Sequence, residues 1–158
     1  MSRKTKRTFL VGLAAFLLAC PASAGASAES RLLGAIDDVR LSHGLPALRD
    51  SGELNRSAER FAQGIISSGR FGHGAHISVP GNWSHLGENL SLTFGSRGAA
   101  TVVRGWMNSP AHRAVILNPS FRYAGVGSAS GRFRGRKATA WTLHVGKPAK
   151  GRRKMRRV

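Results

Sequence analysis

The sequence contains one cysteine, Cys20, and it lies within the first two dozen of the 158 residues. A mature chain that loses this segment forms no disulfide, which excludes a disulfide-stabilised scaffold. Acidic residues are also scarce, with 7 Asp and Glu against 25 Lys and Arg, and none of them follows Glu88. The apolar run over 9–19 falls short of the ~20 residues that cross a membrane, so we expect no transmembrane span.

The segment that carries Cys20 is predicted to be a signal peptide. Four basic residues precede the apolar run, and small residues in an A-x-A pattern follow it. Cleavage after Ala24 removes residues 1–24 and lowers the formal net charge from +18 to +14, because all four charges lost are positive. The alternative takes 17–20 as a lipoprotein box, with Cys20 as the lipidated residue. We expect a secreted or periplasmic protein in either case, and Cys20 is excluded as a catalytic nucleophile.

Positive charge dominates the chain after Glu88. This part contains fifteen Lys or Arg and ends in a basic tail over 148–158. Such a block attracts polyanions, and those available to an exported protein include anionic lipids and glycans of the envelope. We therefore expect peripheral membrane association, while a purely solubilising role of the charge is the alternative. Phe133 is the only aromatic residue among the arginines, so we expect no specific nucleic-acid partner, and we expect a monomer.

Apolar periodicity predicts two helices in the first half of the domain. The first covers 29–43 and ends before Gly44, which suits the left-handed residue after a helix. The second covers 50–69, where Asp50 and Glu53 have the spacing of a capping box. Glycine, histidine and proline then predict a loop between Gly69 and Gly87, with at most a short extended piece.

The second half of the domain is predicted to hold shorter helices followed by strands. The expected elements are a helix over 97–107, a helix that begins at Ser109, and strands over 121–130 and 138–145 joined by a hairpin loop at 131–137. Helices first and strands last predict an α+β fold in which helices cover an antiparallel sheet.

His112 is the first candidate for chemistry. Ser109 is a favoured N-cap and Pro110 a favoured first helical residue, which makes His112 the third residue of its helix. The positive end of the helix dipole disfavours the imidazolium form, so we expect a lowered pKa for His112. A neutral ring can bind a metal or accept a proton, while the alternative is a plain hydrogen bond to a neighbouring loop.

Glu88 and His73 are further candidates. Glu88 is the last carboxylate of the chain, and a salt bridge or backbone hydrogen bonds would lower its pKa, whereas a general base needs it raised. His73, His76 and His85 give H-x-x-H and H-x-x-E spacings, but nearby glycines disfavour the helix that such a metal motif needs. The motifs G-x-S-x-G, Walker A, H-E-x-x-H and paired zinc cysteines are absent, which disfavours those enzyme classes.

Six short motifs occur in a fixed order along the chain. They are GLPAL (44–48), FGH (71–73), GEN (87–89), WMNSPAHRAVIL (106–117), NPSFRYAGVG (118–127) and WTLHVG (141–146). The ordered series resembles the CAP superfamily of cysteine-rich secretory, antigen 5 and pathogenesis-related proteins, and in particular its bacterial SCP-like secreted branch. The resemblance implies a CAP domain over 29–147, folded as an α-β-α sandwich with a cleft where histidines and acidic residues meet.

The resemblance also implies which side chains meet in this cleft. By motif match these are His73, Glu88 and His112. A divalent metal such as zinc is the cofactor that two of them, His73 and His112, could hold as ligands. Two departures matter, because the stretch before Trp106 has no second acidic residue and Leu143 replaces the glutamine of the late strand. The implied site is therefore two histidines and one carboxylate. Further residues expected at the binding site are Asn89, Trp83 and Ser109.

Two functions are consistent with these residues. The first is a binding module for an anionic or lipidic envelope component, in which the basic tail assists the cleft. The second is a divalent-metal-dependent hydrolase, a peptidase or esterase, in which Glu88 activates water. A site without an evident nucleophile or oxyanion device favours the binding module over the enzyme.

Overall fold

The computed structural model describes residues 26–150, so the predicted signal peptide over 1–24 and most of the basic tail lie outside the described residues. Four helices and one four-stranded sheet make up this part of the chain. The elements are α1 (Ala28–Ser42), β1 (Arg49–Asp50), α2 (Gly52–Ser68), β2 (Trp83–Phe94), α3 (Ala99–Met107), α4 (Pro110–Ile116), β3 (Tyr123–Phe133) and β4 (Arg136–Pro148).

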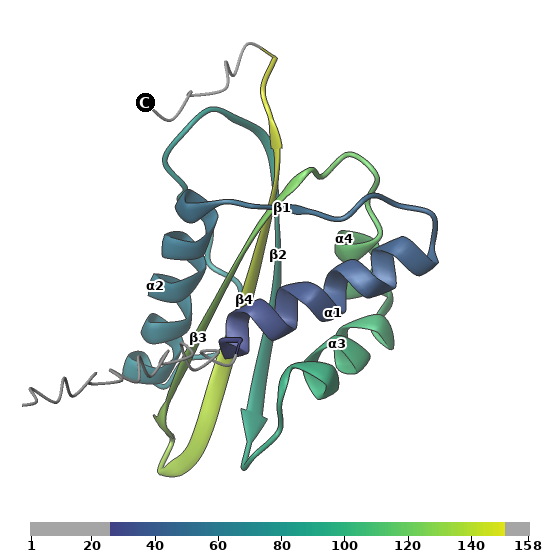
Figure 1. Ribbon diagram of the computed structural model, residues 1–158. Helices are drawn as coiled ribbons and strands as arrows, with labels where there is room; N and C mark the ends of the chain where they lie inside the picture. Colours follow the sequence, from purple (N-terminus) through teal and green to yellow (C-terminus); the bar gives the residue numbers. More distant parts are fainter. Residues whose placement is uncertain (1–25, 151–158) are drawn as a thin grey trace, which may run out of the picture.

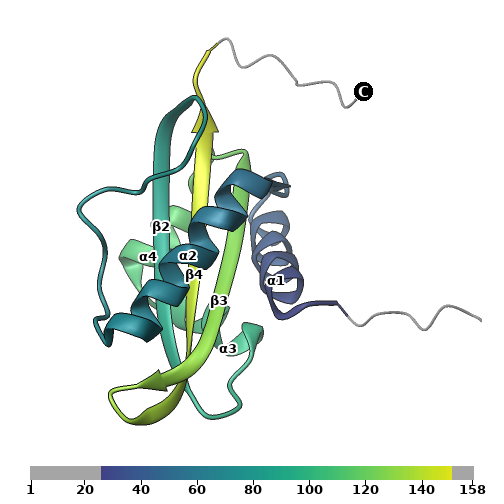
Figure 2. The same cartoon turned by 90° about the vertical axis from the view of Figure 1, so that its left-hand side faces the viewer.

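The sheet has the order β1-β3-β4-β2, and helices cover both of its faces. The β2–β4 and β3–β4 pairs are antiparallel, and the short β1 pairs with β3 in parallel. Helix α2 packs on one face, while α1, α3 and α4 lie on the other, as Figures 1 and 2 show. The predicted α+β fold and α-β-α sandwich are confirmed. Within residues 26–150, no helix has the length and apolar character needed to cross a membrane.

Strand β2 is the main difference from the sequence prediction. The loop predicted up to Gly87 ends earlier, because the strand begins at Trp83 and runs to Phe94. Glycine and asparagine at positions 87 and 89 lower the intrinsic strand propensity of this stretch. Pairing with β4 along nearly the whole strand supplies the stability that the local sequence lacks.

Two local predictions of turn and cap chemistry were wrong. The β3–β4 loop is tighter than the predicted 131–137, since Phe133 pairs with Arg136 and only Arg134 and Gly135 form the turn. Both turn residues have positive φ, of 47° and 82°, as a two-residue hairpin requires. The capping box is also absent: Ser51 is the N-cap of α2 without a side-chain cap bond, and Asp50 instead accepts a hydrogen bond from Asn55.

The face of the sheet under α1, α3 and α4 is filled by large apolar side chains. Its buried members include Leu32, Ile36, Val102, Trp106, Ile116, Phe121, Trp141, Leu143 and Val145. A buried charge holds this layer together at one end, because the guanidinium of Arg40 donates to the carbonyls of Pro46, Ile116, Asn118 and Phe121. These bonds fix the end of α4 and the chain leading into β3 against α1.

The face under α2 is built from small residues. A Cβ placed on Gly125 or Gly127 of β3 would lie 2.1 Å from a backbone nitrogen of α2, at Asn55 or Glu59 respectively. Only glycine allows this approach, so the helix backbone rests directly on the strand. The apolar cluster on this side is correspondingly small, with buried residues Ala62, Ile65, Leu90, Phe133, Ala138 and Ala140.

Candidate functional site

Strands β2 and β4 bring Glu88 and His144 together on the α2 face of the sheet. The two residues are direct partners in the antiparallel ladder, so their side chains point the same way. The Nε2 atom of His144 lies 2.9 Å from Oε2 of Glu88. Both side chains are almost completely buried, with 1% and 5% of their surface exposed.

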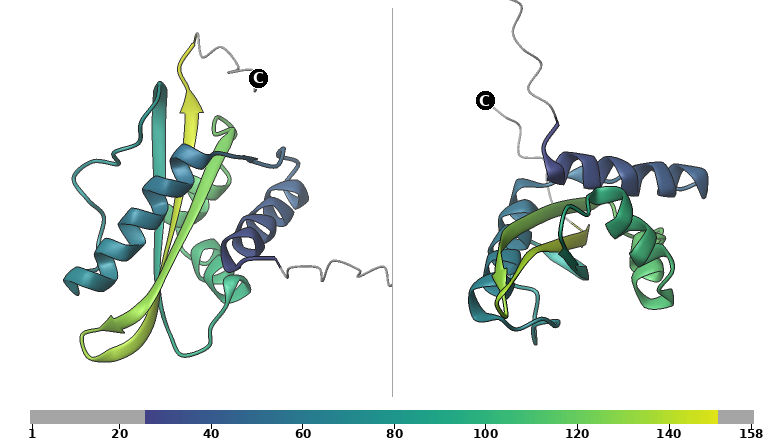
Figure 3. Two further views of the ribbon diagram at one scale, coloured as in Figure 1. Left: turned by 60° about the vertical axis from the view of Figure 1, so that its left-hand side comes forward. Right: turned by 90° about the horizontal axis from the view of Figure 1, so that it is seen from below.

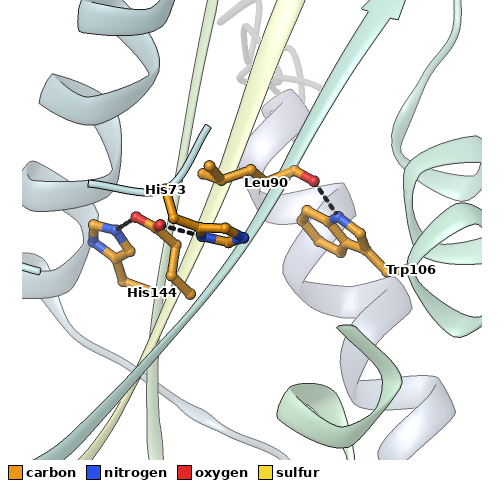
Figure 4. Close-up of polar contacts among 5 residues, drawn as sticks. His73, Leu90, Trp106 and His144 are labelled. Atoms are coloured by element: carbon orange, nitrogen blue, oxygen red, sulfur yellow. Dashed lines mark hydrogen bonds and ion pairs between the residues drawn. The ribbon is translucent and has the colours of Figure 1, made fainter. Parts of the chain in front are cut away.

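The loop before β2 adds His73 to this pair. Its Nδ1 atom lies 2.7 Å from Oε1 of Glu88, and its side chain is 58% exposed. Because an ionised carboxylate only accepts hydrogen bonds, both imidazoles donate an N–H to it. Figure 4 shows the two histidines on either side of the carboxylate. The result is a His73–Glu88–His144 bridge that runs from solvent into the interior.

The hydrogen bonds of this bridge control the charge of Glu88. Burial raises the pKa of its carboxyl, but the bonds from His144 and His73 outweigh burial, and the net pKa is lowered. Glu88 is therefore an ionised acceptor with both oxygens in use. A general base for hydrolysis needs the opposite shift, a raised pKa.

His112 completes the site from α4, at the edge of β2. Its ring centroid lies 6.4 Å from that of His73, with the ring planes at 38°. Burial and the neighbouring His73 both lower the pKa of His112. The predicted direction is confirmed, and burial is its main cause, followed by the neighbouring His73. The structure thus brings together the three residues that the sequence nominated: His73, Glu88 and His112.

The other nominated residues have different surroundings. Asn89 is fully buried and donates from Nδ2 to the carbonyl of His112 at 3.0 Å, so it positions α4 instead of facing a ligand. Ser109 is the N-cap of α4 by position, but its side chain makes no capping bond, contrary to expectation. Trp83 donates to the carbonyl of Pro80 and packs over Gly146, the next residue after His144 on this face of β4. Its role at the rim stays a prediction.

His144 is the site residue that the sequence analysis missed. Its Nδ1 atom is buried without a hydrogen-bond partner among residues 26–150, and its ring packs edge-on against Phe61 of α2 at 6.0 Å. A signal existed, since His144 lies within WTLHVG (141–146), one of the six motifs that carry the family resemblance. The two-histidine site implied by the motifs is therefore a site of three histidines and one carboxylate.

The cluster offers limited ligands for a metal ion. Within the described part of the chain, no group of three or more His, Cys, Asp or Glu side chains is arranged to hold one. Since Nδ1 of His73 carries the proton shared with Glu88, its Nε2 presents a lone pair, an arrangement typical of metal-binding histidines. With His112 this gives two imidazole ligands, whereas a catalytic zinc site has three protein ligands.

The sandwich and its histidine–carboxylate cluster define the class of the protein. The family model described as "CAP: Cysteine-rich secretory protein family" matches residues 33–145. The chain belongs to this family, which confirms the resemblance and its bacterial SCP-like branch. Among curated proteins, uncharacterized protein YkwD of Bacillus subtilis is 30% identical over 108 residues, which cover 63% of this chain and 41% of YkwD. The chain thus matches about two-fifths of the length of that relative.

Solved structures share the fold at low sequence identity. An extracellular protein containing an SCP domain from Bacillus anthracis superposes with a TM-score of 0.62 at 19% identity, over 76% of this chain and 40% of that one. An outer surface protein from Borrelia burgdorferi gives a TM-score of 0.60 at 18% identity, over 75% of this chain and 91% of that one. At such identities the likeness concerns the fold alone.

Proposed function

We propose that the chain is an exported binding module that holds an anionic or lipidic component of the cell envelope at the His73–His112 pair. The carrying observation is the engagement of both Glu88 oxygens by imidazoles. It leaves two histidine rings near each other at the surface, one exposed and one half-buried. The carboxylate of the cluster has a lowered pKa, which makes it a weak base. Such a histidine pair can donate and accept hydrogen bonds without carrying out hydrolysis.

Charge and location support this choice of ligand. No acidic residue follows Glu88, and the tail over 148–158 adds six Lys or Arg to a surface that is already cationic. The predicted signal peptide supports export, as do two proteins of similar fold, an outer surface protein and an extracellular protein. Long-range attraction by the tail would then concentrate the protein at an anionic envelope, an effect that salt weakens.

Vesicle pelleting tests the proposal. We expect the wild-type chain to bind phosphatidylglycerol vesicles better than phosphatidylcholine vesicles, and His73→Ala/His112→Ala to weaken binding about tenfold. His76→Ala/His85→Ala is the matched control, because it removes two exposed histidines from the same part of the chain. Equal binding by the two double variants would contradict the role of the site. The difference in vesicle binding between the full chain and a chain ending at Pro148 measures how much the basic tail contributes to binding.

A divalent-metal-dependent hydrolase is the second candidate. The observation in its favour is the hydrogen bond from Nδ1 of the exposed His73 to Glu88, which leaves Nε2 as the atom that could bind a metal. Zinc titration of the wild type and of His112→Ala by calorimetry tests this site. We expect a metal site to lose affinity when His112 is removed, and identical affinity would exclude His112 as a ligand.

A further inference from the structure

A pocket of about 580 Å³ lies at the end of the sheet where β3 turns into β4. Figure 1 shows this turn and the end of β2 together at the lower end of the molecule, opposite the end where β4 finishes, and Figure 3 shows the same hairpin from two further directions. Residues of the hairpin and of the loop between β2 and α3 line the pocket. The polar ones are Ser96, Ser130, Arg132, Lys137 and Thr139.

Two cations lie side by side in the lining of this pocket. Arg132 and Lys137 are direct partners in the antiparallel β3–β4 ladder, which places their Cβ atoms about 5 Å apart. Like charges in directly opposite positions repel, and the pair is destabilising unless an anion lies between them. The guanidinium of Arg132 donates to the carbonyl of Gly135 at 2.8 Å. Neither cation has an ion pair with a carboxylate of residues 26–150.

Hydroxyl groups continue the same face of the hairpin. Ser130 and Thr139 are cross-strand partners, and their hydroxyl oxygens lie 2.8 Å apart. One hydroxyl donates to the other, so the second hydroxyl proton remains available to a ligand. No acidic side chain lines the pocket. Two cations and a hydroxyl donor around one cavity form a donor set suited to a doubly charged oxyanion.

We propose that this pocket binds the phosphate group of an envelope component, held between Arg132 and Lys137. The shared chemistry is a phosphate ester, whether it belongs to a lipid headgroup or to a soluble phosphorylated polyol. The pocket is separate from the histidine cluster. Thr139 precedes His144 by five residues, or about 17 Å along β4, and lies on the α1 and α3 face instead of the α2 face. The pocket is therefore independent of the histidine site, while the choice of an envelope ligand rests on the export proposed above.

Calorimetric titration of the full chain with inorganic pyrophosphate tests the pocket. Lys137→Gln should raise the dissociation constant about tenfold, the loss of one charge-assisted hydrogen bond. Lys147→Gln is the matched control, because it removes the same charge from an exposed residue near the other end of the same strand, and its effect should stay below about twofold. Equal effects of the two substitutions would overturn the proposal and leave only the net charge as the cause.

Charge reversal gives a sharper form of the test. Lys137→Glu places a carboxylate opposite Arg132, so the repulsive pair becomes attractive. We expect this variant to lose detectable pyrophosphate binding while its thermal midpoint stays equal to or above that of the wild type. Retained binding would overturn the proposal, and the unchanged thermal midpoint excludes unfolding as the reason for a loss.

Two further titrations separate the sources of phosphate and the two sites. Tighter binding of phosphatidylglycerol vesicles than of glycerol phosphate, with the same dependence on Lys137, assigns the pocket to lipid headgroups, and the reverse order assigns it to soluble phosphorylated polyols. If the Lys137 substitution changes the binding of neither probe, the proposal is overturned. His73→Ala/His112→Ala should leave pyrophosphate affinity within about twofold of the wild type, because the sites lie on opposite faces.

Discussion

The two faces of the sheet pack against their helices in different ways. Under α1, α3 and α4, bulky side chains such as Trp106, Trp141 and Leu143 fill the space between the layers. Under α2, glycines 125 and 127 let the helix backbone approach the strand, and the carboxylate–histidine bridge lies beside this contact. The face under α1, α3 and α4, here called the thick face, supplies apolar burial. The face under α2, here called the thin face, positions polar groups. The two faces should therefore respond to opposite changes in side-chain size.

Truncation on the thick face should give the largest loss of stability. Trp106 is 2% exposed, and its indole donates to the carbonyl of Leu90 at 2.9 Å, as Figure 4 shows. We expect Trp106→Ala to lower the free energy of unfolding by about 4 kcal/mol, because it leaves a cavity and an unpaired carbonyl. Urea denaturation measures this value. A loss under about 1 kcal/mol would show that this layer can collapse around a void.

Enlargement on the thin face should come next. A methyl group at position 127 would meet the backbone of Glu59, so Gly127→Ala should cost about 3 kcal/mol or more by forcing α2 away from β3. Gly64→Ala is the control, since no atom lies within 4 Å of a Cβ placed there, in the middle of α2. That change should stabilise the protein by about 0.5–1 kcal/mol. Equal effects at both positions would remove the close approach as an explanation.

Removal of the charge in the bridge should have a smaller effect. Glu88→Gln places an amide NH₂ toward one of two imidazoles that both donate, so one hydrogen bond is lost. We expect a cost of about 1–2 kcal/mol in the free energy of unfolding. Proton NMR should show changed chemical shifts for the ring protons of both His73 and His144, because each ring contacts the substituted side chain. Unchanged spectra for both rings would contradict the bridge.

The pH dependence of stability should give the smallest signal. The pKa of His112 is lowered from its usual value of 6.5, so below pH 6.5 the unfolded chain takes up a proton that the folded protein resists. The pKa of Glu88 is lowered from 4.5, so its contribution is present above pH 4.5 and is lost as the pH falls through the folded pKa. Acidification destabilises the fold in both windows. His112→Ala should flatten the upper window alone in denaturation curves.

The functional contrast between the two faces follows the same division. The histidine cluster is assembled beside α2, from a loop, two strands and the edge helix α4. The proposed phosphate pocket lies at the β3–β4 hairpin, and its cross-strand pairs Arg132–Lys137 and Ser130–Thr139 are on the other face of the sheet. Whether the two faces bind anions independently can therefore be tested by titrating two variants, His73→Ala/His112→Ala and Lys137→Gln.

Local sequence was sufficient where a strong periodic signal existed. The apolar spacing in α1 and α2, the glycine after α1, and the alternation in β4 predicted elements that the structure confirms. Prediction from local sequence failed in β2. Gly87 and Asn89 lower the local strand propensity there, and the strand forms because it pairs with β4. Local rules also misplaced the caps, since Asp50 is held in β1 by pairing with β3 and therefore cannot cap α2.

Short motifs in a fixed order were enough to predict the family, the helical layers and three of the four side chains in the cluster, because they constrain which residues are available. How these side chains act depends on the folded arrangement. Register between β2 and β4 places His144 against Glu88, and the loop places His73 on the other oxygen. A carboxylate shared by two imidazoles is an ionised acceptor, and this property depends on distances that no linear spacing specifies.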